Sequence, residues 1–275
     1  MRCIIDCGST KADWVDIDSA RSIQTDGWNA LTTPPDAIVA TIRQAIDLFE
    51  ERAEQLWIYG AGCTPQRGAW LKQLIEEEVG VPALVESDLV AAVRATCGAE
   101  SGIACIIGTG SNSCCWDGTA IREHTPALGY ILGDEGSGAA LGKQLVADYL
   151  KNQLDGELKE AFEKEYGAIT SEEVVQRVYR ESAPNRWLAS HAPFLHEHLD
   201  TVYCYNLVCD QFVSFLTRNV LQYLTAKETP IHFVGSVAYH FKEVLEIAVE
   251  EVGLQLGSVQ QRPLEGLLKW HRENP

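Results

Sequence analysis

The sequence predicts an α/β protein made of two similar halves, each built on a mixed five-stranded sheet with helical crossovers. In the first half, strand-like runs and helical patterns follow the order β-β-β-α-β-α-β-α. The second half restarts in the same style at Gly102. Residues 6–10 (DCGST) match residues 108–112 (GTGSN) at an offset of 102, which also places Trp14 on Trp116. A repeat of this kind indicates a duplicated architecture.

The first half opens with three strand-like runs separated by turn residues, and alternating elements follow. The first helix carries apolar residues at helical spacing, namely Ile38, Ile42, Ile46 and Phe49, and two prolines suit its entry. We expect strands over 2–7, 12–17 and 22–27, a helix over 35–54, a strand over 55–59, a helix over 65–79, a strand over 82–86 and a helix over 89–97.

The second half begins with three strand-like runs and then becomes mainly helical before a final β-α-β-α run. We expect strands over 102–107, 113–117 and 120–124, helices dominating 139–226, then a strand over 230–234, a helix over 238–252, a strand over 254–259 and a helix over 264–272. The boundary is placed between an N-terminal domain, 1–112, and a C-terminal domain, 113–275. The C-terminal domain carries the helical insertion, and we expect the last helix to pack back on the N-terminal domain.

Charge and composition exclude several function classes. The formal net charge of −17 repels phosphate backbones, so no nucleic acid partner is expected. No apolar run reaches the roughly 20 residues needed to span a bilayer, so no membrane partner is expected either. Asp6 comes too early for a secretory signal. The nine cysteines form no C-x-x-C and are typical of buried thiols in a reducing compartment, so we expect a cytoplasmic protein.

The first turn, in DCGSTKADW, has the residue types of a phosphate site. Gly8 has no Cβ, so a phosphate can approach the backbone N–H groups of the turn closely. Ser9 and Thr10 add hydroxyl donors, and Lys11 adds a positive charge. Asp6 lies at the carboxyl end of its strand and can hold Mg²⁺ through water. A plain hairpin turn is the alternative, because glycine, serine and aspartate favour turns.

The second turn, in IIGTGSNS, has two glycines and no charge. Thr109, Gly110, Ser111 and Asn112 supply backbone, hydroxyl and amide groups. The turn matches neither the GK[ST] loop of Walker-type proteins nor the G-x-G-x-x-G dinucleotide motif. Two such turns that face each other would hold a polyphosphate from both sides, and this pairing carries more weight than either turn alone.

Asp88 follows a predicted strand and opens a predicted helix. Aspartate is a favoured N-cap, which is one interpretation. The other is a general base that takes the proton of an attacking hydroxyl, because ligands of open α/β sheets collect at the carboxyl ends of strands. One residue can serve in both roles.

Three further segments carry polar residues at bends. Asp134 lies next to a second carboxylate in a glycine-rich run before a helix, where it can bind sugar hydroxyls or a metal, or favour the helix dipole. Gly235 and Ser236 join a strand to a helix, either as a plain βα turn or as an approach for a flat ring or phosphate. Trp28 and Asn29 put an aromatic ring beside an amide, which suits an N-acetylated sugar.

In this order, the motifs resemble the N-acetylglucosamine kinase group of the sugar kinase, Hsp70 and actin superfamily, which is also grouped with BadF/BadG-type ATPases. The resemblance covers essentially the whole chain; GTGSN with GDEG is fairly specific, whereas D-x-GST is shared across the superfamily. It implies two ribonuclease-H-like (actin-like ATPase) domains, with ATP and Mg²⁺ in an interdomain cleft. The activity implied is phosphorylation of the 6-hydroxyl of an amino sugar. We also expect a homodimer.

The resemblance implies a role for each matching residue. Asp88 would be the base. Thr10 and Thr109 would contact the ATP phosphates. The other residues on the nucleotide-binding side would be Asp6, Gly8, Ser9, Lys11 and Gly110. The remaining roles are the sugar contacts, given to Asn29, Ser111, Asn112, Gly129 and Asp134, and the border of the adenosine, given to Gly235 and Ser236.

Departures from the family pattern leave the substrate open. Tyr130 stands where the related G-W-G-H run has histidine, so N-acetylmuramic acid is an alternative to N-acetylglucosamine. The chain is also shorter than mammalian-type enzymes, so we expect a trimmed C-terminal domain. Two other functions stay open: an ATPase that drives a partner protein, which the missing C-x-x-C disfavours, and a non-catalytic sugar sensor, which usually carries an added DNA-binding segment that we do not expect here.

Overall fold

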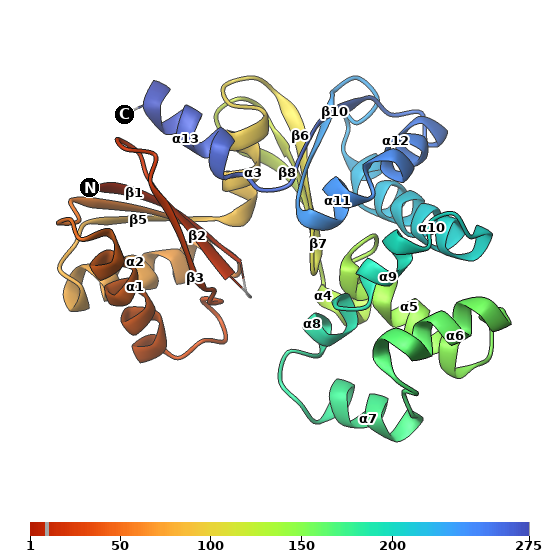
Figure 1. The fold of residues 1–275 in the computed structure, drawn as a ribbon. Helices are drawn as coiled ribbons and strands as arrows, with labels where there is room; N and C mark the ends of the chain where they lie inside the picture. The colour runs from red at the N-terminus through yellow and green to blue at the C-terminus, as the bar shows by residue number, and fades with distance from the viewer. Residues whose placement is uncertain (9–10, 275) are drawn as a thin grey trace. The chain divides into compact units, whose positions relative to one another are not determined.

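The computed structural model describes residues 1–8 and 11–274 and divides into two compact units (Figure 1). Unit 1 comprises Met1–Glu100 and the segment from Arg262 onward, and unit 2 comprises Ser101–Gln261. The sequence placed the boundary between 112 and 113 instead. The difference arises because β6 (Gly102–Ile107) and β7 (Ser111–Trp116) pair antiparallel in one sheet, so the division has to precede both strands.

Unit 1 is a mixed five-stranded sheet with the strand order β3-β2-β1-β4-β5. The first three strands are antiparallel to one another, and β4 and β5 run parallel to β1. Its elements are β1 (Arg2–Cys7), β2 (Lys11–Asp16), β3 (Ser22–Asp26), α1 (Pro35–Phe49), β4 (Gln55–Gly60), α2 (Pro65–Glu78), β5 (Ala83–Ser87), α3 (Asp88–Thr96) and α13 (Leu264–Glu273).

The alternation of β1 decides which helices cover which face of this sheet. Cys3, Ile5 and Cys7 are buried with residues of α1 and α2, whereas Ile4 is buried with residues of α3 and α13. Successive strand residues point to opposite faces, so Asp6 points to the same face as Ile4. The helices α3 and α13 therefore lie over the face that carries Asp6.

Unit 2 repeats this plan, with the strand order β10-β9-β6-β7-β8. The mixed five-stranded sheets predicted for the two halves are confirmed, but the predicted offset of 102 is wrong. β6 begins at Gly102 and β7 at Ser111, which is 100 residues after Arg2 and Lys11, the starts of β1 and β2. Gly108 therefore corresponds to Gly8, and Trp116 does not correspond to Trp14.

The helical region of unit 2 breaks into short helices around one core, rich in phenylalanine. The helix α10 runs through this core and buries Phe212 and Phe215 completely, and Phe233 of β9 is buried with them. The further elements of unit 2 are β8 (Ile121–Thr125), α4 (Gly129–Leu132), α5 (Gly138–Leu150), α6 (Gly156–Tyr166), α7 (Ser171–Tyr179), α8 (Pro184–Ala189), α9 (Ala192–Glu197), α10 (Val202–Arg218), a 3₁₀ turn (Val220–Gln222), β9 (Ile231–Val234), α11 (Ser236–His240), α12 (Lys242–Glu251) and β10 (Leu256–Gln260).

The structure shows how the cysteines are buried and whether a helix could span a membrane. Seven of the nine cysteines are buried, namely Cys3, Cys7, Cys63, Cys105, Cys114, Cys115 and Cys204. Across residues 1–8 and 11–274, no helix combines the length and the apolar character needed to cross a membrane.

Candidate functional site

The first predicted phosphate turn joins β1 to β2. The backbone N–H of Gly8 donates to the carbonyl of Lys11 at 3.0 Å, and the Lys11 side chain is exposed. Gly27 packs against this turn so closely that a Cβ there would lie 2.0 Å from the Gly8 carbonyl oxygen. The predicted phosphate ligands Ser9 and Thr10 lie outside the described residues. The phosphate-binding role of Gly8 and Lys11 therefore stays a prediction.

An acidic row crosses the sheet next to this turn. Asp6 and Asp13 are directly opposite each other in the antiparallel register of β1 and β2, and Gln24 of β3 follows Asp13 in the same row. Gln24 donates from Nε2 to Asp13 Oδ1 at 2.6 Å, and Arg262 Nη1 lies 3.2 Å from the same oxygen. Asp13 is only 6% exposed. Asp13 and Arg262 were not predicted from the sequence, although an aspartate inside the apolar run ADWVD is a usable signal.

Burial and mutual repulsion perturb the carboxylates at this edge. Burial raises the pKa of Asp6 to about 7, and the neighbouring charges of Asp13 and Asp88 add to the effect. Burial also raises the pKa of Asp88 to about 6, even though the backbone N–H of Leu89 stabilises the charged form. A site that holds these charges apart from water favours a cation.

The oxygen donors suit a hydrated divalent cation. Carboxylate oxygens are the ligands that Mg²⁺ prefers, and it usually keeps several waters when few carboxylates are present. Within residues 1–8 and 11–274, no three or more His, Cys, Asp or Glu side chains are grouped so that they could enclose a metal. Asp6 and Asp13 therefore fit a cation held partly through water, and the assignment of Asp6 to the metal remains a prediction.

Asp88 is the first residue of α3, and the helix is capped by its neighbour. The Ser87 hydroxyl accepts from the Val90 N–H at 3.4 Å, so Ser87 is the N-cap. The Asp88 carboxylate accepts from the N–H of Leu89 at 2.9 Å and is half-buried. Since Ser87 already caps the helix, capping does not account for Asp88. Its place at the carboxyl end of β5 suits an acid–base group.

Of the pair Trp28 and Asn29, which the sequence suggested for an N-acetylated sugar, the tryptophan lies in the core. Trp28 is 3% exposed, and its ring packs near Trp14 with the ring centres 6.0 Å apart. The side-chain oxygen of Asn29 accepts from the N–H of Leu31 at 2.9 Å, and this stabilises the local turn. The aromatic half of the predicted sugar contact therefore belongs to the core, because an apolar ring is stabilised by burial beneath the sheet. The role of Asn29 stays a prediction.

The second predicted phosphate turn is tied to the start of α5. The N–H of Gly108 donates to the carbonyl of Gly110 at 2.9 Å. The carbonyls of Gly108 and Thr109 accept from the backbone N–H groups of Gly138 and Ala139 at 2.8 and 3.1 Å. These two bonds fix the turn against the first residues of α5 and orient its backbone.

Asp134 and Ser111, two of the residues predicted to contact the sugar, lie next to each other. Asp134 accepts from the N–H of Ser111 at 3.2 Å, and a Cβ on Gly110 would lie 3.1 Å from the Asp134 carboxylate. Asp134 has a φ of 59°, which is uncommon for a residue with a side chain. Burial raises the pKa of its carboxyl group, and the Ser111 N–H opposes this shift. Such a held, buried carboxylate is a strong acceptor for hydroxyl groups.

Glu135 has a different role from Asp134. Its carboxylate pairs with Arg218 at 2.5 Å and accepts from Asn219 at 3.4 Å, both at the end of α10. Its carbonyl accepts from the Ser111 hydroxyl at 2.7 Å. Glu135 therefore stabilises the bend, while Asp134 points to the predicted ligand turn.

Two other predicted sugar residues lie on β7 and at the start of α4. Asn112 lies on β7, and its side-chain oxygen accepts from the Ser113 N–H at 3.0 Å and lies 2.9 Å from His124 Nε2. Gly129 begins α4 with a φ of 71° and is exposed. Their contact with a sugar stays a prediction.

Gly235 is required by close packing, and Ser236 lines a pocket. A Cβ on Gly235, whose φ is 130°, would lie 2.2 Å from the Ile107 carbonyl oxygen. Ser236 is exposed and borders a pocket of about 470 Å³, whose lining also includes Ala192, His196, Val237, His240 and Phe241. Pockets for small ligands and cofactors usually occupy about 300–1,000 Å³, so this one has the size for a nucleoside.

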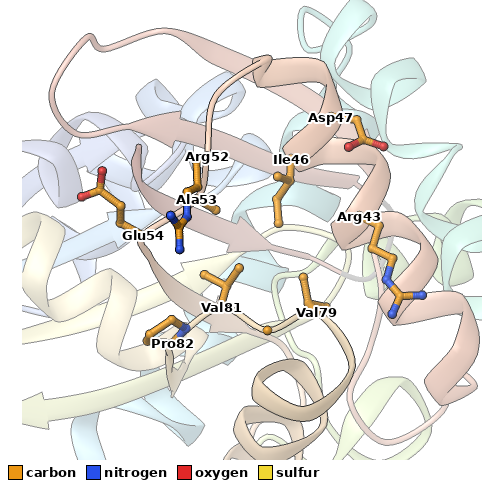
Figure 2. A pocket seen from close by; sticks show the side chains of 10 residues that line it. Arg43, Ile46, Asp47, Arg52, Ala53, Glu54, Val79, Val81 and Pro82 are labelled. Carbon is orange, nitrogen blue, oxygen red and sulfur yellow. The ribbon is translucent and has the colours of Figure 1, made fainter.

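A different pocket, of about 830 Å³, lies on unit 1 at the opposite edge of its sheet (Figure 2). Ala53 and Glu54 precede β4, and Val81 and Pro82 precede β5, so the pocket is at the amino ends of these parallel strands. Asp88 follows the carboxyl end of β5. The pocket and Asp88 therefore lie at opposite ends of the same strands.

Comparisons with known proteins give the fold independent support. No family model and no curated protein sequence matches the chain. Among solved structures, a candidate N-acetylglucosamine kinase from Porphyromonas gingivalis is 43% identical, with 100% of this chain and 99% of that chain covered and a TM-score of 0.94. A candidate N-acetylglucosamine kinase from Chromobacterium violaceum is 18% identical over 98% and 99%, with a TM-score of 0.72. A ROK family glucokinase from Streptomyces griseus, in complex with glucose and AMPPNP, is 15% identical over 99% of both chains, with a TM-score of 0.57. The last two show the fold alone.

Proposed function

The chain belongs to the sugar kinase–Hsp70–actin superfamily, in the family of the Porphyromonas gingivalis protein, and on that premise we propose that it is an ATP-dependent amino-sugar kinase. The substrate would be N-acetylglucosamine or N-acetylmuramic acid, phosphorylated on its 6-hydroxyl. The 43% identity over nearly the full length of both chains supports the choice of an amino sugar.

The observation that carries the proposal is the state of Asp88. A general base works best when its pKa lies near the operating pH, and burial raises the pKa of this carboxyl group to about 6. At pH 7 and above, Asp88 is therefore mainly ionised and can accept the proton of the attacking hydroxyl. The hydroxyl oxygen then attacks the terminal phosphorus of ATP, the bond from that phosphorus to the ADP oxygen breaks, and ADP leaves.

On the nucleotide side, Gly8 and Lys11 would border the phosphates with Ser9 and Thr10. Asp6 and Asp13 would hold Mg²⁺, which supplies positive charge to the phosphate oxygens when it is bound. The two carboxylates face each other across β1 and β2, and this supports a shared role toward one cation.

Unit 2 has the remaining residues that we propose for binding ATP and the sugar. Thr109 and Gly110 would contact phosphate, and Gly235 and Ser236 would border the adenosine, for which the pocket of about 470 Å³ offers space. Asp134 would accept hydrogen bonds from sugar hydroxyls, together with Ser111, Asn112, Gly129 and Asn29. A hydrogen bond to a charged group contributes roughly 1.5–3 kcal/mol, so the buried Asp134 would be the main sugar anchor.

The proposal is tested by a panel of sugars with ATP and Mg²⁺, scored by ADP release. We expect turnover with N-acetylglucosamine or N-acetylmuramic acid and much less with glucose. ADP release that no sugar stimulates would favour the ATPase alternative, and sugar binding without ADP release would favour a sugar sensor. Phosphorylation of glucose alone would contradict the amino-sugar assignment. Light scattering on the same sample tests the expected homodimer.

A matched pair of variants tests the catalytic assignment. Asp88→Asn should lower turnover by about 100-fold or more, the usual scale for a lost acid–base group. Asp36→Asn is the control, because Asp36 also lies in the first turn of a helix of unit 1 but is exposed. We expect the control to keep wild-type turnover.

A further inference from the structure

Arg262 brings a positive charge to the acidic row from the far end of the chain. It is the first residue of the segment that returns to unit 1, and α13 begins two residues later at Leu264. Its Nη1 lies 3.2 Å from Asp13 Oδ1, with 46% of the Arg262 side chain exposed and 8% of the Asp13 side chain. The ion pair is therefore buried on the acidic side and open to water on the basic side.

The row that Arg262 meets has a surplus of negative charge. Asp6 and Asp13 occupy opposed positions of an antiparallel pair, where side chains typically lie about 4.5–5.5 Å apart at Cβ and like charges destabilise the sheet. Gln24 donates to Asp13 but carries no charge. Arg262 and Lys11 are the cations whose fields oppose this repulsion at Asp6, and Lys11 is exposed. Arg262 is the one of the two that contacts the row directly.

The position of Arg262 does not depend on its ion pair, because α13 is held by other contacts. Gly266 approaches α3 so closely that a Cβ would lie 2.4 Å from the Ala95 carbonyl oxygen. The guanidinium of Arg94 lies 4.3 Å from the centre of the Trp270 ring. Arg272 donates two hydrogen bonds to the Ile17 carbonyl, at 2.8 and 3.0 Å. These contacts hold α13 in place, so Arg262, two residues before the helix, stays near the row whether or not Asp13 is engaged elsewhere.

We propose that Arg262 is a positioning residue that serves as the resident counter-cation of Asp6 and Asp13. It offsets part of their negative charge while no metal is present, and it weakens metal binding because it competes for Asp13. The half-exposed guanidinium can turn to water when a divalent cation takes its place. This role rests on the proposed function, which supplies Mg²⁺ as the cation.

The test uses Mn²⁺ as the probe, without nucleotide or sugar. Free Mn²⁺ is titrated by electron paramagnetic resonance, and thermal unfolding is recorded with and without Mg²⁺. In Arg262→Gln we expect Mn²⁺ affinity to rise by about three- to tenfold, because a positive charge beside the site is removed. We expect its melting temperature to fall without metal and to recover with Mg²⁺. Arg262→Lys keeps the charge and should match the wild type in both measurements.

Arg272→Gln is the matched control, because it changes the net charge equally and loosens the same helix without touching Asp13. It should lower the melting temperature to the same extent with and without Mg²⁺ and leave Mn²⁺ affinity unchanged. Equal or weaker Mn²⁺ binding in Arg262→Gln, or a stability loss that Mg²⁺ does not relieve, would overturn the proposal and reduce Arg262 to an anchor of α13. These measurements need no turnover, so they are independent of whether the sugar panel succeeds.

Discussion

Replacing Asp88 by asparagine should make the protein more stable while it removes activity. Burial raises the pKa of Asp88 from 3.8 to about 6. A difference of about 2.2 pH units at about 1.36 kcal/mol each sets an upper limit of about 3 kcal/mol on what the ionised carboxylate costs the fold, because solvent screens part of the charge of a half-buried group. The folded state binds the proton more tightly than the unfolded state. The stabilising contribution is therefore complete below pH 3.8 and is lost as the pH rises through 6.

Asparagine has nearly the same shape and no charge, and its oxygen can still accept from the Leu89 N–H. At pH 8, Asp88→Asn should therefore raise the free energy of unfolding by up to about 3 kcal/mol, and at pH 5 the gain should shrink to about half. Urea unfolding at both pH values measures this change, with Asp36→Asn as the control that should show no such gain. ADP release from the same samples should fall by about 100-fold or more.

An asparagine variant that is no more stable than the wild type at pH 8 would show that burial does not perturb the Asp88 carboxylate. A variant that keeps its turnover would show that Asp88 is not the base.

Three further perturbations test other parts of the account. Burial lowers the pKa of His271 to about 4, so the free energy of unfolding should fall by up to about 3 kcal/mol as the pH falls from 6.5 to 4. His271→Gln should remove this pH dependence, which urea unfolding measures. An unchanged pH dependence would show that His271 is not its source. Gly235→Ala places a Cβ 2.2 Å from the Ile107 carbonyl oxygen and should destabilise the fold by several kcal/mol, on the order of the strain and overpacking terms. Gly253 also has a positive φ, of 72°, but nothing lies within 4 Å of an added Cβ, so Gly253→Ala should cost only about 1 kcal/mol. Urea unfolding compares the two variants, and equal losses would show that lack of space is not the cause. Ser236→Trp should fill part of the pocket of about 470 Å³ and raise the KM for ATP by about tenfold or more without changing the KM for the sugar, and an unchanged KM for ATP would move the adenosine elsewhere.

Local patterns sufficed for most of the architecture. The strand over residues 2–7 and the helix from Pro35 were predicted because apolar spacing and proline act over a few residues. The helix over 35–54 was too long, because Glu50 takes a left-handed conformation at the C-cap and ends α1 at Phe49. The grouping of Ser111 with Asp134 came from the family resemblance, since no local pattern links residues so far apart in the sequence.

The features that the sequence did not predict depend on contacts between distant parts of the chain. The offset of 102 aligned identical residues, Trp14 with Trp116, whereas the strands of the two halves begin 100 residues apart. Asp13 became a site residue only through its register opposite Asp6. Arg262 reaches Asp13 from 249 positions later in the chain. Strand register and the return of α13 are decided by tertiary packing, which a single sequence does not display.

The central claim is phosphoryl transfer from ATP to the 6-oxygen of an N-acetylated amino sugar. The most direct measurement is phosphorus–proton NMR of the reaction with N-acetylglucosamine and with N-acetylmuramic acid. We predict a new phosphate ester coupled to the two protons on carbon 6, formed in a one-to-one ratio with ADP and absent with Asp88→Asn. Inorganic phosphate as the product, or an ester at another position, would contradict the account.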